Sequence, residues 1–445
     1  MINDDLSEPR PSHGLQAMMR RWEQLHPVNA VQIAWLNRTV GIDAVCAAAD
    51  RVFGRLTRRR SGPAAHLPPA LDPRDHGPAG FEFQHRPFVG DWRTMLEGAV
   101  TTELNRPYDD GVPPWRVFLF ESPGCGQFLA LGYRHVIADA RSVALVLHEI
   151  VRQTVTPSDE PAGFEAEPRP ESVKDLYPEE FRWRRIPSLP WNPLRELWAS
   201  RRAFRPPCDD PRDLRMEFRI HGDVALSGLK AASRRHDATI NDLLFAAILE
   251  WLARRYPLQR RGRRPDLAVA ALADLTGRSA NALPRAFGQY LSQFAVRLQV
   301  APGMPFDEIV RQAARCSQAA KRIGPLIDGA RGFDVLAKLW DRIPLLRRPD
   351  FLPALIPLLA GVSNVHLGAV VNDGRTASAM SSYFRGTCVT NLVPMMLCLT
   401  TVGDSCTLTT THRPTVFTSA DMTALAAHLH ERLDPARHAA VPAAA

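Results

Sequence analysis

The chain has 445 residues, more than one hydrophobic core usually serves, so its length predicts two domains or lobes. Hydrophobic residues make up 45% and charged residues 23%, which is typical of a soluble globular protein and excludes a disordered or collagen-like one. The formal net charge of +8 would suit nucleic acid, but only four of the 55 basic residues are lysine, a skew that indicates codon bias. The densest basic cluster, Arg254 to Arg264, lacks the interleaved aromatics of a single-strand binder, so we predict no nucleic-acid partner. That cluster is either a solvated helix end or a docking site for an acidic carrier protein, CoA phosphates or lipid heads.

The sequence shows no membrane span and no secretory signal. The longest apolar run, Phe351 to Val362, is short and holds two prolines, and the first residues, MINDDLSEPRP, are polar and acidic. We therefore expect a cytoplasmic protein, for which peripheral contact with a membrane stays open. Its seven cysteines form no CxxC pair and have no histidine at ligand spacing, which predicts neither a disulfide framework nor a metal site.

The predicted elements of the first part of the chain are a hairpin and a helix. Arg116 to Glu121 and Phe128 to His135 are extended apolar runs on either side of a short loop with two glycines, which is a hairpin signal. From Ser142 to Val151 the apolar residues take helical spacing. The order is therefore strand, tight loop, helix, with His135 at the strand end.

A proline-rich stretch follows and divides the chain. Residues 156–211 contain eleven of the 38 prolines, so regular structure should be sparse there. We predict an N-terminal lobe at 1–155 and a C-terminal lobe at 212–445, each mixing helices and strands. In the second lobe we expect a helix at 241–256 with Asn241 as its N-cap, strands at 267–272 and 290–300, and a helix at 418–433.

The loop after the first hairpin carries the best candidate for chemistry. No GxSxG, Walker A, GxGxxG or HExxH motif is present, so hydrolase, kinase, dinucleotide and zinc-protease functions lose their best support. What remains is His135 followed four residues later by Asp139, a pattern that can present an imidazole to a cleft. The pair His430 and Asp434 has the same spacing but falls on the predicted terminal surface helix. The position of His135 at the end of a strand therefore makes it the candidate, whereas its spacing to Asp139 alone would not.

In this context the chain resembles the CoA-dependent acyltransferase superfamily, which includes chloramphenicol acetyltransferase, condensation domains of nonribosomal peptide synthetases and the wax-ester-synthase/diacylglycerol-acyltransferase group. Its HHxxxDG signature is matched at His135 and Asp139, while Arg134 and Ala140 replace the first His and the Gly. Further blocks resemble the family in order along the chain: LNRPY at 104–108, PWRV at 114–117, TINDLLFA at 239–246, DLTGR at 274–278, GQYLS at 288–292 and VSNV at 362–365.

The resemblance implies an α/β (α+β) fold of two chloramphenicol-acetyltransferase-like lobes with a tunnel between them. It implies transfer of an acyl group from acyl-CoA or a phosphopantetheinyl carrier protein to a small hydroxyl or amine acceptor, with His135 as general base. No cofactor would be bound, and any acyl carrier protein would act in trans. Asp139 is expected to be structural and to pair with Arg278. Ser363 and Asn364 are candidates for the oxyanion site or the tunnel wall.

The two departures from the signature leave a second hypothesis open. If Arg134 and Ala140 disable the site, the chain would be a degenerate member that binds acyl groups or carrier proteins without catalysis. At Ala140, a positive φ would cost about 1 kcal/mol, so an active loop needs an ordinary dihedral there.

Overall fold

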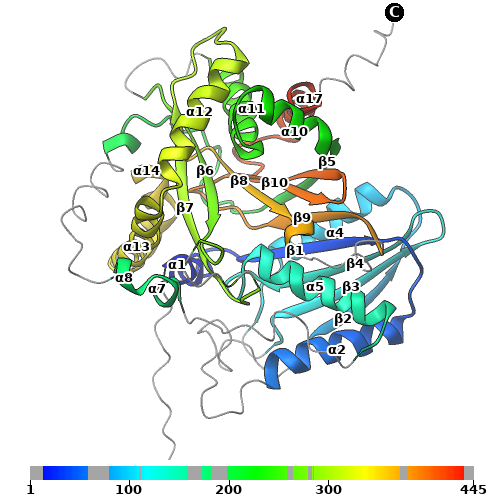
Figure 1. Cartoon of the computed structure of the whole chain (residues 1–445). Helices are drawn as coiled ribbons and strands as arrows, with labels where there is room; N and C mark the ends of the chain where they lie inside the picture. Colours follow the sequence, from blue (N-terminus) through cyan, green and yellow to red (C-terminus); the bar gives the residue numbers. More distant parts are fainter. Residues whose placement is uncertain are drawn as a thin grey trace, which may run out of the picture.

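The protein, seen here as a computed structural model, folds into two lobes that each contain one β-sheet (Figure 1). The structure describes residues 14–58, 80–109, 112–158, 172–181, 198–257, 264–278, 283, 285–370 and 379–434. The predicted α/β class with two lobes is confirmed. No helix within these ranges is long and apolar enough to cross a membrane.

The first sheet has five strands, four of them from the N-terminal part of the chain. In spatial order they are β2 (Glu82–Pro87), β3 (Trp115–Ser122), β4 (Gly126–Arg134), β1 (Asn29–Leu36) and β9 (Met380–Thr387). β2 and β3 are parallel, and the other neighbours are antiparallel. β3 and β4 are the predicted hairpin.

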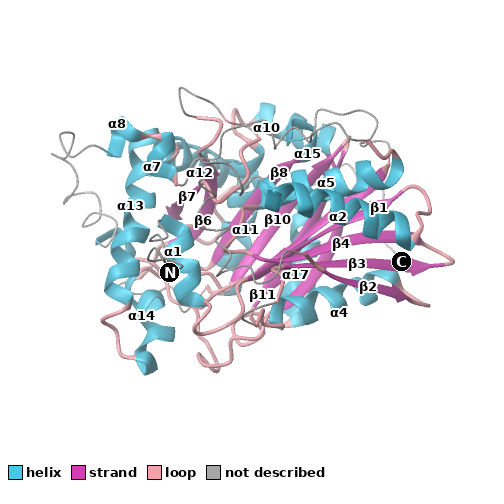
Figure 2. Ribbon diagram, turned by 90° about the horizontal axis from the view of Figure 1, so that it is seen from below, coloured by secondary structure: helices cyan, strands magenta, loops and turns pink. Residues whose placement is uncertain are grey.

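Helices cover both faces of this sheet, because its strands alternate apolar side chains between the two faces. Val117 and Leu119 pack in one core with α2 (Ile42–Arg58) and α5 (Ala140–Val155), whereas Phe118 and Phe120 pack in another with α4 (Trp92–Asn105). Figure 2 shows α2 and α5 on one side of the strands and α4 on the other. The predicted helix after His135 is α5.

The second sheet has six strands. Their order is β5 (Glu217–Ala225), β11 (Ser405–His412), β10 (Met395–Val402), β8 (Ala360–His366), β6 (Leu267–Asp274) and β7 (Leu291–Leu298). The pairs of β8 with β10 and with β6 are parallel. The helices of this part of the chain are α10 (Leu226–Arg235), α11 (Ile240–Arg255), α12 (Phe306–Ala320), α13 (Ile323–Trp340), η4 (Leu345–Arg347), α14 (Arg348–Leu355), α15 (Leu367–Val370) and α17 (Ser419–Leu433). The helices and strands predicted in this half are confirmed as α11, β6, β7 and α17.

The start of α11 differs from the prediction in its cap. Thr239, not Asn241, is the N-cap, and it forms a capping box in which its side chain accepts from the backbone N–H of Asp242 and the Asp242 side chain accepts from Thr239. Asn241 is the second residue of the helix, so its side chain is left for another contact.

Two segments cross between the lobes. β9 follows β8 in the chain but pairs with β1 in the first sheet, with Ala30 opposite Thr387 and Ala34 opposite Tyr383. α1 (Gly14–Trp22) packs beside α13, where the backbone N–H of Gly14 donates to Asp334 Oδ1 at 2.6 Å (Figure 1). The described part of the connection between the halves includes the one-turn helices α7 (Val173–Leu176) and α8 (Pro178–Phe181), and residues 198–200 are helical too. The division at 156–211 stays a prediction, and the sheets do not follow it strictly.

Candidate functional site

His135 lies where β4 ends and the loop to α5 begins. Its backbone N–H donates to the carbonyl of Val28 at 2.8 Å, and only 5% of the residue is exposed. Its Nδ1 lies 3.0 Å from the carbonyl oxygen of Ala138. Because a carbonyl oxygen can only accept, Nδ1 must carry the hydrogen, and the lone pair of the neutral ring is on Nε2.

Burial lowers the pKa of His135 below the ordinary imidazole value of 6.5. The carbonyl of Ala138 acts in the opposite direction, and the positive charge of Arg385 adds to the lowering. The ring is therefore neutral at neutral pH, and it can accept a proton through Nε2.

Asp139 is the N-cap of α5 and does not touch the imidazole. Its side chain accepts from the backbone N–H of Ser142 at 2.8 Å and from that of Tyr290 at 3.4 Å, and 1% of the residue is exposed. Burial raises its pKa, while the nearby positive charge of Arg141 opposes the rise. These contacts hold the start of α5, and hence the loop that carries His135, against the second lobe.

The predicted pair of Asp139 with Arg278 is wrong. Arg278 donates instead to the backbone carbonyl of Lys321 at 3.0 Å on the exposed surface. The guanidinium that acts on Asp139 is that of Arg141, which is itself paired with Asp274 at 3.1 Å. A buried N-cap carboxylate already has its donors in the backbone, so it does not need a distant arginine.

A short segment before β7 clamps the histidine loop. The backbone N–H of Asp139 donates to the carbonyl of Gly288 at 2.9 Å, and that of Gly288 donates to Ser142 Oγ at 3.2 Å. The Gln289 side chain donates to the carbonyl of His135 at 3.2 Å. The blocks at 134–142 and 288–292, distant in sequence, thus form one structural unit.

Both departures from the HHxxxDG signature are accommodated. Arg134 makes a bidentate ion pair with Glu23, Nε to Oε1 at 2.7 Å and Nη2 to Oε2 at 2.8 Å, which ties β4 to the segment that follows α1. Ala140 is the first residue of α5 and has no positive φ, so the missing glycine causes no strain there.

A cavity of about 250 Å³ lies beside His135, between the two sheets. It brings together three predicted site residues, His135, Ser363 and Asn364, whereas Asp139 and Arg278 do not line it. Its other lining residues are Ala30, Gln32, Tyr133, Ala140, Arg141, Leu272, Asp274, Leu291, Val365, His366, Arg385, Gly386, Thr387 and Met396. Strands of both sheets therefore supply the walls.

The two candidates on β8 have different surroundings. Ser363 Oγ accepts a hydrogen bond from Arg385 Nη1 at 2.9 Å, which leaves the hydroxyl hydrogen free to be donated. The side-chain amide of Asn364 donates to Asn241 Oδ1 at 2.8 Å, and the residue is exposed. Ser363 is thus the better placed of the two to act on a molecule in the cavity.

The sequence did not point to Arg385 or Gln32. Arg385 is on β9 and reaches the cavity only because that strand crosses to the first sheet. Gln32 donates to the carbonyl of Ala140 at 2.8 Å and accepts from the Tyr383 hydroxyl, so it bridges the loop and β9. The one available signal was an arginine within an otherwise uncharged strand, MSSYFRGT.

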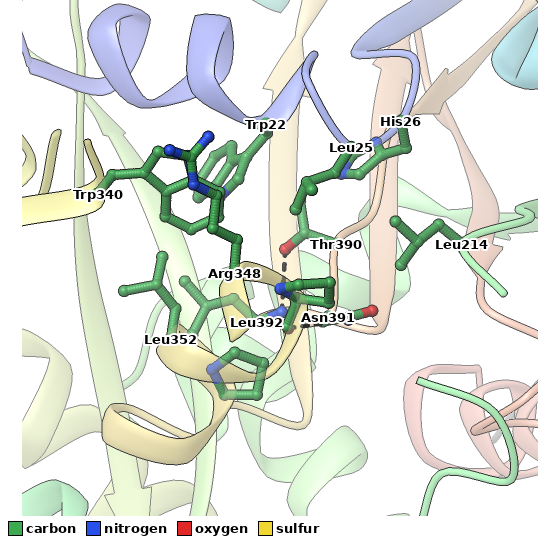
Figure 3. Close-up of a pocket in the computed structure, with 12 residues that line it drawn as sticks. Trp22, Leu25, His26, Leu214, Trp340, Arg348, Leu352, Thr390, Asn391 and Leu392 are labelled. Carbon is green, nitrogen blue, oxygen red and sulfur yellow. Dashed lines mark hydrogen bonds between the residues drawn. The ribbon is translucent and has the colours of Figure 1, made fainter. Parts of the chain in front are cut away.

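A second, much smaller cavity lies where α1 meets α14 (Figure 3). Its volume is about 20 Å³, which is room for a single water at most. Trp22, Trp340 and Leu352 pack around it, with the Arg348 side chain alongside (Figure 3). This site is a packing junction of the lobes, too small for a substrate.

No protein-family model matches the chain, and no curated protein sequence matches it. Solved structures, in contrast, match the chain over most of its length. The first condensation domain of the CDA synthetase aligns with 96% of this chain and 98% of its own, at 16% identity and a TM-score of 0.61. A variant of the starter condensation domain of rhizomide synthetase RzmA, in complex with C8-CoA and Leu-SNAC, aligns over 95% and 92% at 13% identity and a TM-score of 0.59. The chain has the condensation-domain fold.

The same fold also occurs in a protein complex. The X-domain from teicoplanin biosynthesis, solved with OxyB, aligns over 97% of this chain and 94% of its own at 16% identity and a TM-score of 0.51. At such identities the likeness shows the condensation-domain fold, and activity has to be argued from the site. The fold agrees with the superfamily that the sequence resembles.

Proposed function

We propose that the protein is an acyltransferase that moves an acyl group from a CoA or carrier-protein thioester to a hydroxyl or amine acceptor. The observation that carries the proposal is the bond from His135 Nδ1 to the carbonyl of Ala138, in a buried loop that lines the cavity. This bond leaves Nε2 as a base, and the lowered pKa keeps it neutral at neutral pH.

The proposed reaction needs no cofactor, because each proton and each bond is accounted for by the imidazole and the two substrates. Nε2 of His135 takes the proton of the acceptor O–H or N–H while the oxygen or nitrogen attacks the thioester carbonyl, which forms the new C–O or C–N bond. The tetrahedral intermediate then collapses, the C–S bond breaks, and the leaving thiolate takes the proton from the imidazolium. Asp139 is a positioning residue in this scheme, because it holds the loop and does not contact the ring.

Ser363 is our candidate donor to the oxyanion. Its Oγ already accepts from the Arg385 guanidinium, which polarises the hydroxyl and leaves its hydrogen for a developing negative charge. Asn364 is retained as a residue of the cavity wall, since its amide is engaged with Asn241.

We propose acyl-CoA or a phosphopantetheinyl carrier protein acting in trans as donor, in the cytoplasm. The basic cluster from Arg254 to Arg264, a candidate for carrier docking, lies partly outside the described residues. Within them, Arg254 pairs with Glu250 at 2.7 Å and Arg255 with Asp421 at 2.6 Å, as expected of a charged helix end.

The test is single-turnover acyl transfer by the wild type and by His135→Ala and His135→Gln. Acetyl-CoA and octanoyl-CoA are offered with a panel of alcohols and amines, and thiol release is followed from pH 5 to 9. We expect the variants to lose about 100-fold or more in rate and to keep the fold, as shown by circular dichroism and a cooperative thermal transition. The wild-type rate should decline with acid only below pH 6.5, because the pKa of His135 is lowered.

The matched control is His85→Ala, which changes a histidine of β2 that pairs with Glu121. This variant should keep the wild-type rate. Near-equal rates for wild type and both His135 variants would show that His135 is not the base. A wild type that binds acyl-CoA but transfers no acyl group would favour the binding-only hypothesis.

A further inference from the structure

Arg385 is a buried cation whose contacts are all uncharged. Only 3% of the residue is exposed. Its Nε donates to Thr400 Oγ1 at 2.8 Å, its Nη1 to Ser363 Oγ at 2.9 Å, and its Nη2 to the carbonyls of Ser363 and Leu399 at 2.8 and 2.9 Å. No carboxylate of the described residues lies within ion-pair distance of it.

Such an arrangement is unusual because a buried charge normally has a partner of opposite sign. A guanidinium stays protonated inside a protein, so Arg385 cannot escape the cost of burial by losing its charge. Four of its five N–H groups are engaged, which leaves one on Nη1. Since Arg385 lines the cavity beside His135, its charge acts on any molecule bound there, and this N–H is not used by the four contacts above.

The other charged groups of the cavity do not balance Arg385. Arg141 and Asp274 form an ion pair at 3.1 Å and cancel each other. His135 is neutral, because burial lowers its pKa. His366 lies at the exposed rim and adds no negative charge. Among the residues that line the cavity, Arg385 is therefore the charge that no lining carboxylate balances.

We propose that Arg385 binds a carboxylate of the acyl acceptor, so that the acceptor is a free amino acid or hydroxy acid. This inference rests on the proposed function and narrows its acceptor class. A carboxylate suits a cation with a single free N–H, whereas a phosphate would need several donors. An acceptor tethered to a carrier protein is disfavoured, because its carboxyl carbon is held in the thioester and carries no charge.

The first experiment measures binding without catalysis. Calorimetry is run with hydrophobic L-amino acids and the matching 2-hydroxy acids, each beside its own carboxamide. We expect the wild type to prefer the acids about tenfold or more, as a charge-assisted hydrogen bond predicts. Arg385→Gln should reduce that preference to less than about twofold, and Arg385→Lys, which keeps the charge, should retain part of it. A wild type that binds no acid of the panel, or binds acid and amide alike, overturns the proposal.

Controls separate this site from general charge and from folding. Arg311→Gln removes an exposed arginine of α12 that pairs with Glu308, and should leave the preference unchanged. If it abolishes the preference, the effect is one of net charge and the proposal fails. Because Arg385 also joins β9 to β8 and β10, Arg385→Gln is first checked by circular dichroism. If Arg385→Gln does not fold, the ratio of acid affinity to amide affinity, measured for the wild type and for Arg385→Lys, decides whether the site binds a carboxylate.

Turnover separates this inference from the proposed function. Acid-selective binding that survives in His135→Ala, with no acyl transfer by the wild type, would sink the proposed function and leave the carboxylate site standing. Acyl transfer to acid and amide acceptors with equal kcat/KM would sink the carboxylate site and leave the proposed function standing. If Arg385→Gln lowers kcat equally for both acceptors and leaves KM unchanged, the arginine acts on the oxyanion and our assignment is wrong.

Discussion

At the scale of single residues, the backbone controls the chemistry of the histidine loop. The carbonyl of Ala138 sets the tautomer of His135, and Asp139 acts on the ring only by capping the helix that follows. The sequence predicts a structural role for this acid, through an ion pair with Arg278. In three dimensions the same acid satisfies two backbone N–H groups, and so it fixes the loop between two secondary structures.

Asp139→Ala should therefore destabilise the whole protein. The change removes the N-cap bond to the N–H of Ser142, typically worth about 1 kcal/mol, and removes the side-chain acceptor of the buried N–H of Tyr290, at about 1 to 3 kcal/mol for such a group. We expect the free energy of unfolding to fall by about 2 to 4 kcal/mol and the acyl-transfer rate to fall with it, as measured by urea denaturation and thiol release.

Asp139→Asn is the matched variant, because its amide oxygen can still accept from Ser142. It should recover most of the stability and of the rate. If Asp139→Ala unfolds like the wild type but has no activity, the carboxylate takes part in catalysis and its structural assignment is wrong.

At the scale of elements, the position of the histidine depends on a glycine in another part of the chain. Gly288 precedes β7 and donates to Ser142, and a Cβ added there would lie 2.7 Å from Tyr290 Oη and 2.8 Å from Tyr290 Cζ. The ring of Tyr290 is buried and cannot move aside. The glycine of the GQYLS block thus leaves room for the Tyr290 ring beside the histidine loop.

Gly288→Ala is predicted to displace the clamp and hence His135. We expect a loss of about 1 to 3 kcal/mol in unfolding free energy, as for overpacking, and a clear loss of acyl-transfer rate. Gly277→Ala is the control from the same connection, because a Cβ there meets nothing within 4 Å. Equal effects of the two changes on stability and rate would contradict the clamp.

Local pattern was enough to predict the hairpin, α5, α11 and α17, because each has a strong apolar period of its own. The crossing of β9 could not be predicted this way, since its short sequence does not identify β1 as its neighbour in the sheet. Arg385 was missed for the same reason. The partner of Asp139 was mistaken because Arg278 matched a family block, whereas the actual contacts are backbone groups that any sequence supplies.

At the scale of the whole molecule, several buried histidines make stability depend on pH. Burial lowers the pKa of His26 to about 4, of His221 to about 3 and of His412 to about 4. In the unfolded chain these groups bind protons near pH 6.5. Below that pH the unfolded state therefore binds more protons than the folded state, and acid favours unfolding.

From pH 7.5 to 5.5 we expect the unfolding free energy to fall by about 1 kcal/mol for each of these three histidines. Carboxylates with lowered pKa, such as Asp213 at about 2, add their own loss only at lower pH, whereas buried Asp139 and Glu103, whose pKa is raised by burial, act against the histidines. Urea denaturation at the two pH values measures the difference. Equal midpoints and equal slopes would mean that the histidines are protonated in the folded protein as easily as in the unfolded chain.

The exchange of segments between the lobes decides whether either half can fold alone. Without β9, β1 becomes an edge strand with unpaired backbone groups along a buried sheet, and Ala30 and Ala34 lose the strand that covers them. Without α1, the second half loses the helix that packs beside α13. Each half therefore exposes apolar surface and open hydrogen-bonding groups when it is separated from the other.

We predict that residues 1–158 and 172–445, expressed separately, are insoluble or unfolded, and that the same pieces expressed together form a soluble complex. The driving force is the antiparallel pairing of β1 with β9 together with the buried junction around Trp22 and Trp340. Co-purification through a tag on one piece, followed by circular dichroism, measures this. A variant with Tyr383→Pro should prevent assembly, because proline cannot donate within the β9 ladder. If residues 1–158 alone give a cooperative unfolding transition, the first lobe folds without β9, and the two halves are independent domains joined by the proline-rich connection.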